Sequence, residues 1–244
     1  MLMKIALIGY GAMGKLIERL AVEKGYEIAA IVDESDAERT PAEIAGKLYG
    51  CDVAIDFTTA SAVRRNVEAC LSSHVPLVEG TTGWNEDLEA ISRMVTHANG
   101  AMVYGANFSI GVNLFYRIAD FAAELFSKFP QYETFIEEQH HSRKLDAPSG
   151  TALKLKDIVA EHIKKDFTIA ATRAGNIPGT HRVGFDGPAD QILLEHTARS
   201  REGFAHGALH ATEWVVGKQG FFEFTDILNQ IIELKPQINT DEHK

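Results

Sequence analysis

The first hundred residues alternate between short apolar runs and stretches in which apolar residues recur at helical spacing. A short apolar run bounded by turn residues predicts a buried strand, and apolar residues three and four apart predict a helix. The pattern predicts strands over residues 3–8, 27–32, 51–57, 75–80 and 101–107, and helices over residues 12–25, 61–74 and 85–97. Such alternation is typical of an α/β fold with a doubly wound parallel sheet, which binds ligands at the carboxyl ends of its strands.

The pattern changes after residue 108, where strands no longer alternate regularly with helices. It predicts helices over residues 110–128, 149–165 and 204–216, and strands over residues 132–139, 171–185 and 190–200. The last two strand segments are linked by glycine-rich turns and have no crossover helix between them. We therefore expect a second, α+β domain with a mixed or antiparallel sheet over residues 109–216, after which residues 217–244 return to the first domain, residues 1–108.

Composition and charge exclude several classes of protein. The 244 residues are 45% hydrophobic and 24% charged, as in ordinary globular domains, and the formal net charge of −10 argues against a nucleic-acid partner. No apolar run approaches the ~20 residues of a membrane-spanning helix, and the N-terminus lacks the pattern of a signal peptide. Cys51 and Cys70 match no metal-binding or redox spacing. We therefore expect a cytoplasmic protein with two reduced thiols and without a membrane or nucleic-acid partner.

A glycine-rich turn, Gly9-Tyr10-Gly11-Ala12-Met13-Gly14, joins the first predicted strand to the first predicted helix. In such a G-x-G-x-x-G turn the first glycine permits the tight turn, the second lets the backbone approach a pyrophosphate, and the third lets helix and strand pack closely. These features predict that the first domain binds a dinucleotide.

An acidic residue, Asp33, ends the second predicted strand, where it is expected to accept hydrogen bonds from the adenosine ribose. Glu34 follows it, at a position where an NADP-selective site would benefit from an arginine. Two adjacent acids would repel a 2′-phosphate, so NADH is favoured over NADPH as the cofactor. Arg39, in the following loop, would oppose this preference.

Two further strand ends, with sequences EGTTG (79–83) and GANFS (105–109), carry small, hydroxyl and amide residues that suit a nicotinamide ring and its carboxamide. The same residues are also common in ordinary turns. The expected cofactor-binding residues are Ile8, Gly9, Tyr10, Gly11, Ala12, Met13, Gly14, Asp33, Gly80, Thr81, Thr82, Gly105, Ala106, Asn107 and Phe108.

Residues 138–152, with the sequence EQHHSRKLDAPSGTA, combine histidines, cations and a helix start. His140 and His141 are able to donate a proton near neutral pH, and Lys144 is able to hold a carboxylate. A helix that begins near Ser149 offers free backbone N–H groups, and Gly150 lets an anion come close to them. A surface histidine pair, a solvated loop and a plain helix cap would explain each feature singly. Together they predict a site that holds an acidic substrate beside a proton donor.

The same segment resembles the signature E-x-H-H-x-x-K-x-D-A-P-S-G-T-A of dihydrodipicolinate reductases. The resemblance covers nearly the whole chain. It extends, in the expected order, to GYGAMGK (9–15), EGTTGW (79–84), GANFSIGVN (105–113), RAGNIPGTHRVGFDG (173–187) and HTARSREGFAHGAL (196–209).

The resemblance implies an NAD(P)H-dependent reductase of the diaminopimelate and lysine biosynthetic pathway. Its substrate would be the dihydrodipicolinate formed from 4-hydroxy-tetrahydrodipicolinate, and its product tetrahydrodipicolinate. The resemblance makes His140 the proton donor, His141 a second substrate histidine, and Lys144 a residue of catalysis and substrate binding, while Gly150 and Thr151 would bind a substrate carboxylate. No metal is needed, because the substrate is an activated imine and the nicotinamide carries the reducing equivalents.

The family fold is a Rossmann-like domain plus a substrate-binding and oligomerisation domain whose sheets associate into a homotetramer, and the resemblance implies the same here. One departure is the short, acidic connection over residues 35–50, where many relatives have a longer segment. Because this connection follows Asp33, it leaves the adenosine contacts and the choice between NADH and NADPH open.

Two other functions compete with this interpretation. Another two-domain NAD(P)-dependent dehydrogenase would share the first domain, but many such families carry Glu-Lys-Pro where this chain has Glu79-Gly80-Thr81. A non-catalytic NAD-sensing regulator would have no need of the histidines, the lysine and the helix start of residues 138–152.

Overall fold

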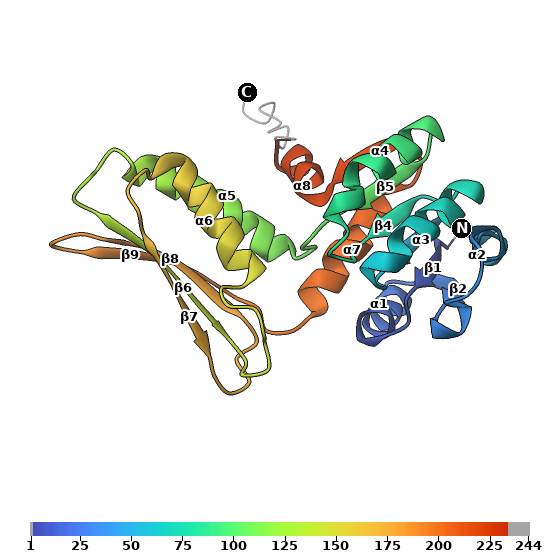
Figure 1. The fold of residues 1–244 in the computed structure, drawn as a ribbon, viewed down its shortest axis with the longest axis horizontal. Helices are drawn as coiled ribbons and strands as arrows, with labels where there is room; N and C mark the ends of the chain where they lie inside the picture. The colour runs from blue at the N-terminus through green and yellow to red at the C-terminus, as the bar shows by residue number, and fades with distance from the viewer. Residues whose placement is uncertain (1, 234–244) are drawn as a thin grey trace, which may run out of the picture. The chain divides into compact units, whose positions relative to one another are not determined.

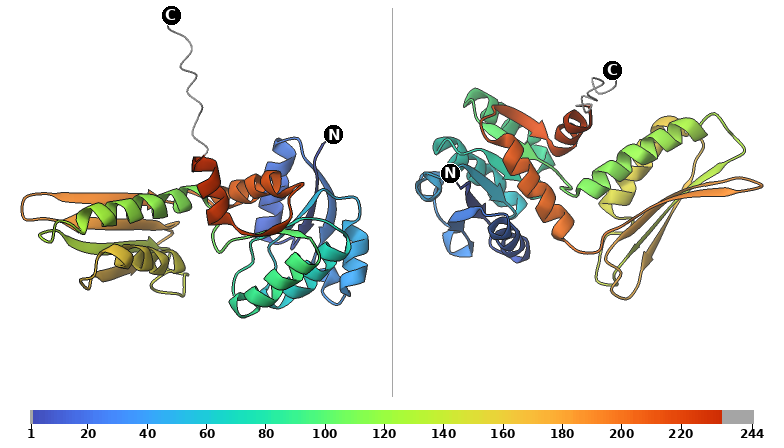
Figure 2. Two further views of the ribbon diagram at one scale, coloured as in Figure 1. Left: turned by 90° about the horizontal axis from the view of Figure 1, so that it is seen from above. Right: turned by 180° about the vertical axis from the view of Figure 1, so that it is seen from behind.

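The chain, described by a computed structural model over residues 2–233 with side chains through residue 230, folds into two compact units. Unit 1 consists of Met1–Phe108 and Phe204–Lys244, and unit 2 of Ser109–Gly203. Figures 1 and 2 show a sheet with its own helices in each unit.

Unit 1 contains a six-stranded sheet in the order β10-β5-β4-β3-β1-β2, with every pair parallel. Its strands are β1 (Lys4–Ile8), β2 (Glu27–Val32), β3 (Val53–Asp56), β4 (Leu77–Glu79), β5 (Ala101–Tyr104) and β10 (Gly220–Glu223). Its helices are α1 (Ala12–Glu23), α2 (Pro41–Leu48), α3 (Ala60–Ser72), α4 (Leu88–His97), α7 (Glu202–Val215) and α8 (Phe224–Glu233), with short 3₁₀ turns η1 (Glu34–Asp36) and η2 (Asn85–Asp87). The predicted doubly wound parallel sheet is confirmed.

Both faces of the unit 1 sheet are covered, which explains why its strands are continuous apolar runs. Successive residues of a strand point to opposite faces, so Ala6 and Ile8 of β1 pack into the core that α2, α3 and α4 cover. Ile5 and Leu7, between them, are equally buried. Figure 2 shows α1 and α7 on the opposite side of this sheet from α3 and α4.

Helices α2 and α8 and strand β10 of unit 1 were not predicted from the sequence. Helix α2 lies in the short, acidic connection over residues 35–50. It begins with a capping box, because Glu43 accepts from the Thr40 backbone N–H at 2.8 Å and Thr40 accepts from the Glu43 N–H. Strand β10 is a four-residue edge strand paired with β5.

The boundary where the chain returns to unit 1 differs from the expected one. The sequence pattern predicted this boundary between residues 216 and 217, whereas the structure divides the chain between residues 203 and 204. Helix α7 belongs with unit 1 because its backbone at Gly207 lies against the Phe108 carbonyl, where a Cβ would collide. Residues 234–244 of the expected return lie outside the described residues.

Unit 2 contains a four-stranded mixed sheet in the order β7-β6-β8-β9, in which β6 and β7 are parallel and the other pairs antiparallel. Its strands are β6 (Glu133–His140), β7 (Thr168–Arg173), β8 (Thr180–Asp186) and β9 (Gln191–Thr197), and its helices are α5 (Ile110–Phe126) and α6 (Gly150–His162). The two helices cover one face of the sheet, as Figure 1 shows, and their apolar residues form one core with Ile136, Val183 and Phe185. The expected mixed sheet is confirmed.

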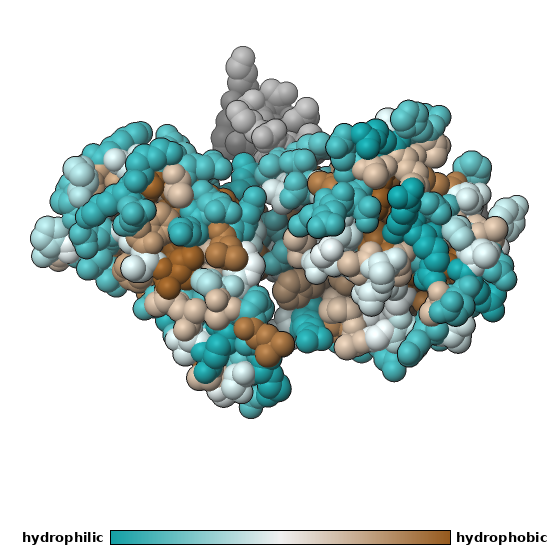
Figure 3. All heavy atoms as spheres, in the orientation of Figure 1, coloured by the Kyte–Doolittle hydropathy of each residue, from teal (hydrophilic) through white to brown (hydrophobic). Residues whose placement is uncertain are grey.

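Large apolar side chains are also exposed on unit 2. On α5 they lie three and four residues apart, at Leu114, Ile118, Phe121 and Leu125, and on β9 they are Ile192 and Leu193. Figure 3 shows apolar patches among hydrophilic residues on the face of unit 2 that it presents. No helix within residues 2–233 is long and apolar enough to span a membrane.

Candidate active site

The glycine turn after β1 is closely packed at its first and third glycines and open at its second. Gly9 has a φ of +89°, and a Cβ there would collide with the Phe57 carbonyl oxygen, while a Cβ on Gly14 would collide with the carbonyl of Gly9. Around Gly11 the space is open, and as the N-cap of α1 it places no side chain over the first-turn N–H groups. No acidic residue occupies the first turn of α1. This helix start is therefore open to an anion.

The strand order brings the predicted cofactor turns to one edge of the sheet. Strands β1, β3, β4 and β5 are successive neighbours and all parallel, so the turns that follow them share the carboxyl edge. The order reverses between β1 and β3, which is the topological switch point where doubly wound sheets bind ligands. Residue 57, after β3, already contacts the turn at Gly9.

Two acids that follow β2, Asp33 and Asp36, differ in burial and in their partners. Asp33 is exposed, and its Oδ1 accepts from the Ser35 backbone N at 2.9 Å and from the Ser35 Oγ at 2.7 Å, so these hydrogen bonds hold its pKa below the usual value. Asp36 is buried and forms ion pairs at 2.6 Å with both Lys47 and Arg39. Arg39, the cation expected to favour NADPH, is therefore paired with Asp36 of its own loop.

The turns after β4 and β5 place their predicted residues differently. Thr81 is buried and engaged inside unit 1, since its hydroxyl accepts from the Thr58 N at 2.9 Å and its carbonyl accepts from the Trp84 Nε1 at 2.7 Å. Thr82 and Ala106 are exposed. Phe108 is a core residue whose ring packs 4.6 Å from that of Phe224, so a cofactor contact at position 108 has to come from the backbone.

In unit 2, His140 ends β6 and is nearly buried, at 8% exposure. Its Nδ1 pairs with the Oε2 of Glu138, which lies two residues earlier and therefore on the same face of the strand. Glu138 is itself buried, and its Oε1 accepts from Arg173 Nη2 at 2.6 Å and from the Ser149 backbone N at 3.1 Å. This arrangement fixes the orientation of the ring and leaves Nε2 as the nitrogen that Glu138 does not hold.

The electrostatics of this pair follow from its partners. Burial by itself would raise the pKa of Glu138, but the hydrogen bonds from Arg173, His140 and Ser149 outweigh it and lower the pKa. Glu138 is therefore a buried, ionised carboxylate. Burial lowers the pKa of His140, and the charges of Lys144 and Arg173 act in the same direction, while Glu138 opposes them.

The predicted substrate residues surround this pair in unit 2. His141 is half-buried, and among the described residues its Nδ1 has no hydrogen-bond partner. The ammonium of Lys144 lies 2.8 Å from Asp146 Oδ1. Gly150 begins α6 in open space, and Thr151, beside it, is half-buried and hydrogen-bonded to Tyr116.

Three residues of this cluster escaped the sequence analysis as site residues: Glu138, Arg173 and His181. The i, i+2 spacing of Glu138 and His140 on a strand was a usable signal. For Arg173 and His181 the signal was their place in the family-like segment over residues 173–187. That segment did not show that sheet register pairs them with His140 and Glu138. His181 packs 5.1 Å from the ring of His140, its Nε2 lies 3.1 Å from Ser149 Oγ, and burial lowers its pKa to about 4.

The donor atoms of Glu138, His140 and His181 lie within 4.8 Å of one another, as metal ligands would. Both carboxylate oxygens of Glu138 are already held by Arg173, Ser149 and His140. The cluster is therefore built as a hydrogen-bonded network around an imidazole.

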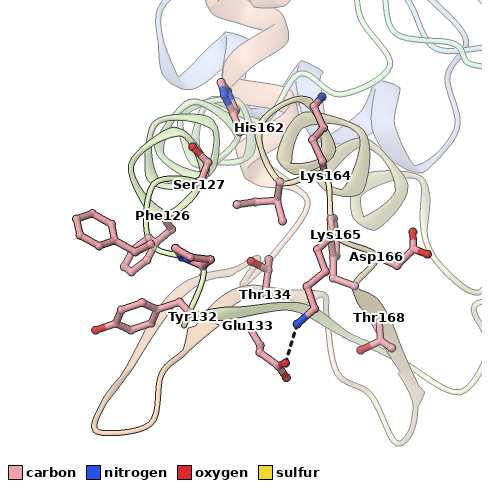
Figure 4. A pocket seen from close by; sticks show the side chains of 14 residues that line it. Phe126, Ser127, Tyr132, Glu133, Thr134, His162, Lys164, Lys165, Asp166 and Thr168 are labelled. Carbon is pink, nitrogen blue, oxygen red and sulfur yellow. Dashed lines mark hydrogen bonds and ion pairs between the residues drawn. The ribbon is translucent and has the colours of Figure 1, made fainter.

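A separate hollow of about 370 Å³ lies in unit 2 where α5 and α6 end, lined by residues such as Phe126, Tyr132 and His162. Figure 4 shows the Lys165–Glu133 ion pair beside it, 2.8 Å between Nζ and Oε1. None of the predicted catalytic or substrate residues lines this hollow.

Comparison with known proteins identifies the family. Residues 3–108 match the family described as dihydrodipicolinate reductase, N-terminus, and residues 111–228 the one described as dihydrodipicolinate reductase, C-terminus. A 4-hydroxy-tetrahydrodipicolinate reductase of Christiangramia forsetii is 36% identical over 95% of this chain and 100% of its own length, and one of Archaeoglobus fulgidus is 34% identical over 93% and 100%.

Solved structures agree on the fold. The dipicolinate-bound dihydrodipicolinate reductase from Paenisporosarcina sp. TG-14 has a TM-score of 0.76 at 24% identity, covering 93% of this chain and 100% of that one. A probable dehydrogenase from Thermotoga maritima has a TM-score of 0.57 at 11% identity, covering 92% of each chain. With both of its parts matched along nearly their whole length, the chain belongs to the dihydrodipicolinate reductase family of NAD(P)H-dependent oxidoreductases.

Proposed function

We propose that this chain reduces the dihydrodipicolinate formed from 4-hydroxy-tetrahydrodipicolinate to tetrahydrodipicolinate with NAD(P)H, in diaminopimelate and lysine biosynthesis. The names of its relatives support the reaction. The observation that carries the proposal for the site is the buried Glu138–His140 pair at the head of the segment with His141, Lys144 and the start of α6. The substrate class agrees with the dipicolinate bound to a relative of the same fold.

His140 is the proposed proton donor. When bound, the nicotinamide supplies a hydride to the unsaturated ring, and the resulting enamine then needs a proton. Glu138 holds the ring by Nδ1, which leaves Nε2 to carry and deliver that proton. Burial lowers the pKa of His140 and so favours the neutral ring. A substrate dianion beside the ring would raise that pKa and favour the protonated form.

The substrate carboxylates are proposed to bind to His141, Lys144, the backbone N–H groups at Gly150 and Thr151, and the Thr151 hydroxyl. A carboxylate at Lys144 would compete with Asp146 for the ammonium. Charge-assisted hydrogen bonds of this kind are worth roughly 1.5–3 kcal/mol each. The N-terminus of α6, which begins at Gly150, adds partial positive charge that would attract the same carboxylates.

The cofactor is proposed to bind unit 1, with its pyrophosphate at the turn from Gly9 to Gly14 and its ribose at Asp33. Thr82, Gly105 and Ala106 would line the nicotinamide side of the carboxyl edge. NADH is the proposed preference, because Asp33 and Glu34 present two carboxylates while Arg39 is paired with Asp36.

We also propose a cytoplasmic homotetramer that assembles through unit 2. The exposed apolar residues of α5 and β9 support an assembly that covers them. Multi-angle light scattering of the purified chain tests it, and a monomer at working concentration would contradict it.

The direct test of the function is oxidation of NADH and NADPH by the purified chain, followed by absorbance while the upstream synthase generates the substrate. Turnover that requires the synthase product supports the proposal. Tight NADH binding without turnover would instead support the alternative of an NAD-sensing regulator. Activity that survives treatment with a chelator is also expected, because the Glu138 oxygens are occupied by protein donors.

A further inference from the structure

Two acidic side chains end neighbouring strands of unit 1, and the proposed mechanism uses neither of them. Asp56 and Glu79 are register partners at the ends of β3 and β4. Register partners of parallel strands point to the same face, about 4.8 Å apart. Both side chains are completely buried, at 0% exposure. Two ionised carboxylates cannot be stable in such a position without compensation.

The hydrogen-bond donors around the pair favour one negative charge, placed on Asp56. Its Oδ2 accepts from the buried Asn66 Nδ2 at 2.7 Å, and the Thr81 hydroxyl lies 3.5 Å from its Oδ1. The guanidinium of Arg65 donates to Asn66 Oδ1 at 3.2 Å, which orients the amide with its NH₂ toward Asp56. These contacts lower the energy of a charged Asp56.

Glu79 has a different set of partners. Its Oε1 accepts from the Thr81 backbone N at 2.8 Å. Its Oε2 is buried and, within residues 2–230, receives no hydrogen from any donor, although the side chain is in contact with Asp56. A proton on Glu79 makes this oxygen a donor to Asp56 and removes the unsatisfied group.

We propose that Asp56 and Glu79 share one proton and act as a positioning pair that fixes the Gly80–Thr82 turn for cofactor binding. The proposal rests on the proposed function, in which this turn lies at the nicotinamide side. Glu79 accepts from the Thr81 backbone N–H, and Asp56 lies close to the Thr81 hydroxyl. The Thr81 hydroxyl also accepts from the Thr58 N–H, and the Thr81 carbonyl accepts from Trp84. The pair thus links the turns after β3 and β4.

The pH dependence expected of the Asp56–Glu79 pair follows from the titratable groups around it. Burial, and then the charge of Asp56, raise the pKa of Glu79 well above that of an ordinary carboxyl group. Helix α3 presents Cys70 and the Arg65–Asn66 link to the pair, and β5 presents Tyr104 in register with Glu79. Burial raises the pKa of both the Cys70 thiol and the Tyr104 hydroxyl, so neither releases a proton before its usual range.

Loss of the shared proton at alkaline pH would place two negative charges side by side and push the strand ends apart. The turn at Thr81 would lose its fixed position, and the cofactor would bind more weakly. Glu79→Gln mimics the protonated acid, because its amide both donates to Asp56 and accepts from Thr81.

The test measures the Kd of NADH by fluorescence titration of the full chain between about pH 6 and pH 9, a range in which buried carboxyl groups titrate. In the wild type we expect the Kd to rise about tenfold or more with pH, the loss expected when a buried polar contact is broken. Glu79→Gln should bind as the wild type does at pH 6 and show no such rise. Glu79→Leu, which cannot hold Thr81, should bind about tenfold more weakly throughout the range. Glu89→Gln, an exposed acid of α4, is the matched control and should follow the wild type.

Three results would overturn the proposal in different ways. A wild-type profile as flat as that of Glu79→Gln would exclude the shared proton. Wild-type affinity in Glu79→Leu would exclude the positioning role. If neither NADH nor NADPH binds the wild type at any pH, the proposed function fails together with the role of the turn. The shared proton is then judged from the melting temperatures of wild type and Glu79→Gln over the same pH range.

Discussion

Glu79, at the end of β4 in unit 1, and Glu138, near the end of β6 in unit 2, are both buried, and their surroundings drive them toward opposite protonation states. Glu79 lies beside another acid, so burial and the Asp56 charge raise its pKa together. Glu138 lies between Arg173, His140 and Ser149, whose hydrogen bonds lower its pKa in spite of burial. The comparison teaches that burial sets only a starting direction for a carboxyl group, and that its nearest donors and charges decide its state.

The two states suit different tasks. A neutral acid is both a donor and an acceptor, so Glu79 is able to lock a turn. A charged acid stabilises a neighbouring imidazolium, so Glu138 is able to orient His140 and support its protonated form.

The largest expected effect concerns the residue that Glu138 supports. His140→Gln keeps a hydrogen-bonding side chain at the end of β6 but has no proton to give. We expect kcat to fall ~10²–10⁴-fold, the usual contribution of a general acid, with little change in the Kd of NADH. Steady-state kinetics and cofactor titration check both values. Near-normal turnover would remove His140 as the proton donor.

Glu138→Gln tests the charged side of the comparison. Without the carboxylate, Arg173 loses its ion-pair partner and His140 loses the group that raises its pKa. We expect kcat to fall about ten- to a hundredfold, as for a lost charge-assisted hydrogen bond. The alkaline fall of kcat should also move to lower pH, because the imidazolium gives up its proton earlier.

The matched control for this variant is Glu137→Gln, the neighbouring acid of β6, which is paired with Arg182. Its pH profile should be that of the wild type. An unchanged pH profile in Glu138→Gln would show that Glu138 only supports the fold.

Substrate binding beside this pair is tested by Lys144→Ala and Thr151→Ala. Each should raise the KM of the substrate about tenfold or more, since each removes a contact to a carboxylate, and Lys144→Ala should also lower kcat. Lys154→Ala, an exposed lysine of α6, should change neither value. If both site variants keep the wild-type KM, the start of α6 does not bind the substrate.

The acids at the end of β2 are in contact with solvent, unlike Glu79 and Glu138. Because Asp33 and Glu34 are exposed, their repulsion of a 2′-phosphate is screened by water and salt, and the preference for NADH should be modest. Glu34→Arg should improve kcat/KM for NADPH by up to about tenfold, as one charge-assisted contact would. A wild type that already prefers NADPH tenfold would contradict the placement of these acids at the ribose.

The smallest expected effect is on stability, and it concerns Glu79. Its raised pKa means that the folded chain keeps a proton that the unfolded chain has released, so the free energy of unfolding falls as pH rises from the usual carboxyl range to the raised pKa. Glu79→Gln does not titrate. Its melting temperature should match the wild type near pH 4 and exceed it by a few degrees at neutral pH, as roughly 1 kcal/mol would produce. A constant difference across pH would contradict a raised pKa.

The sequence by itself determined the order of elements and the residues with obvious chemistry. The hydrophobic period and the turn residues depend only on neighbours along the chain. They were therefore enough to predict strands β1 to β5 of unit 1, the glycine turn and the segment with His140, Lys144 and Gly150. Helix α2 was also within reach, because its Thr-Pro-x-Glu capping box is local. The α/β plus mixed-sheet architecture followed from the same local patterns.

Only the tertiary structure decided which distant side chains meet. Sheet register pairs Asp56 with Glu79 and brings Arg173 and His181 to the Glu138–His140 pair. Packing of α7 against residue 108 also placed the domain boundary earlier than expected. The physical reason is that burial and the charge of a neighbour across the sheet fix the protonation state of a carboxyl group, and neither is a property of its own stretch of sequence.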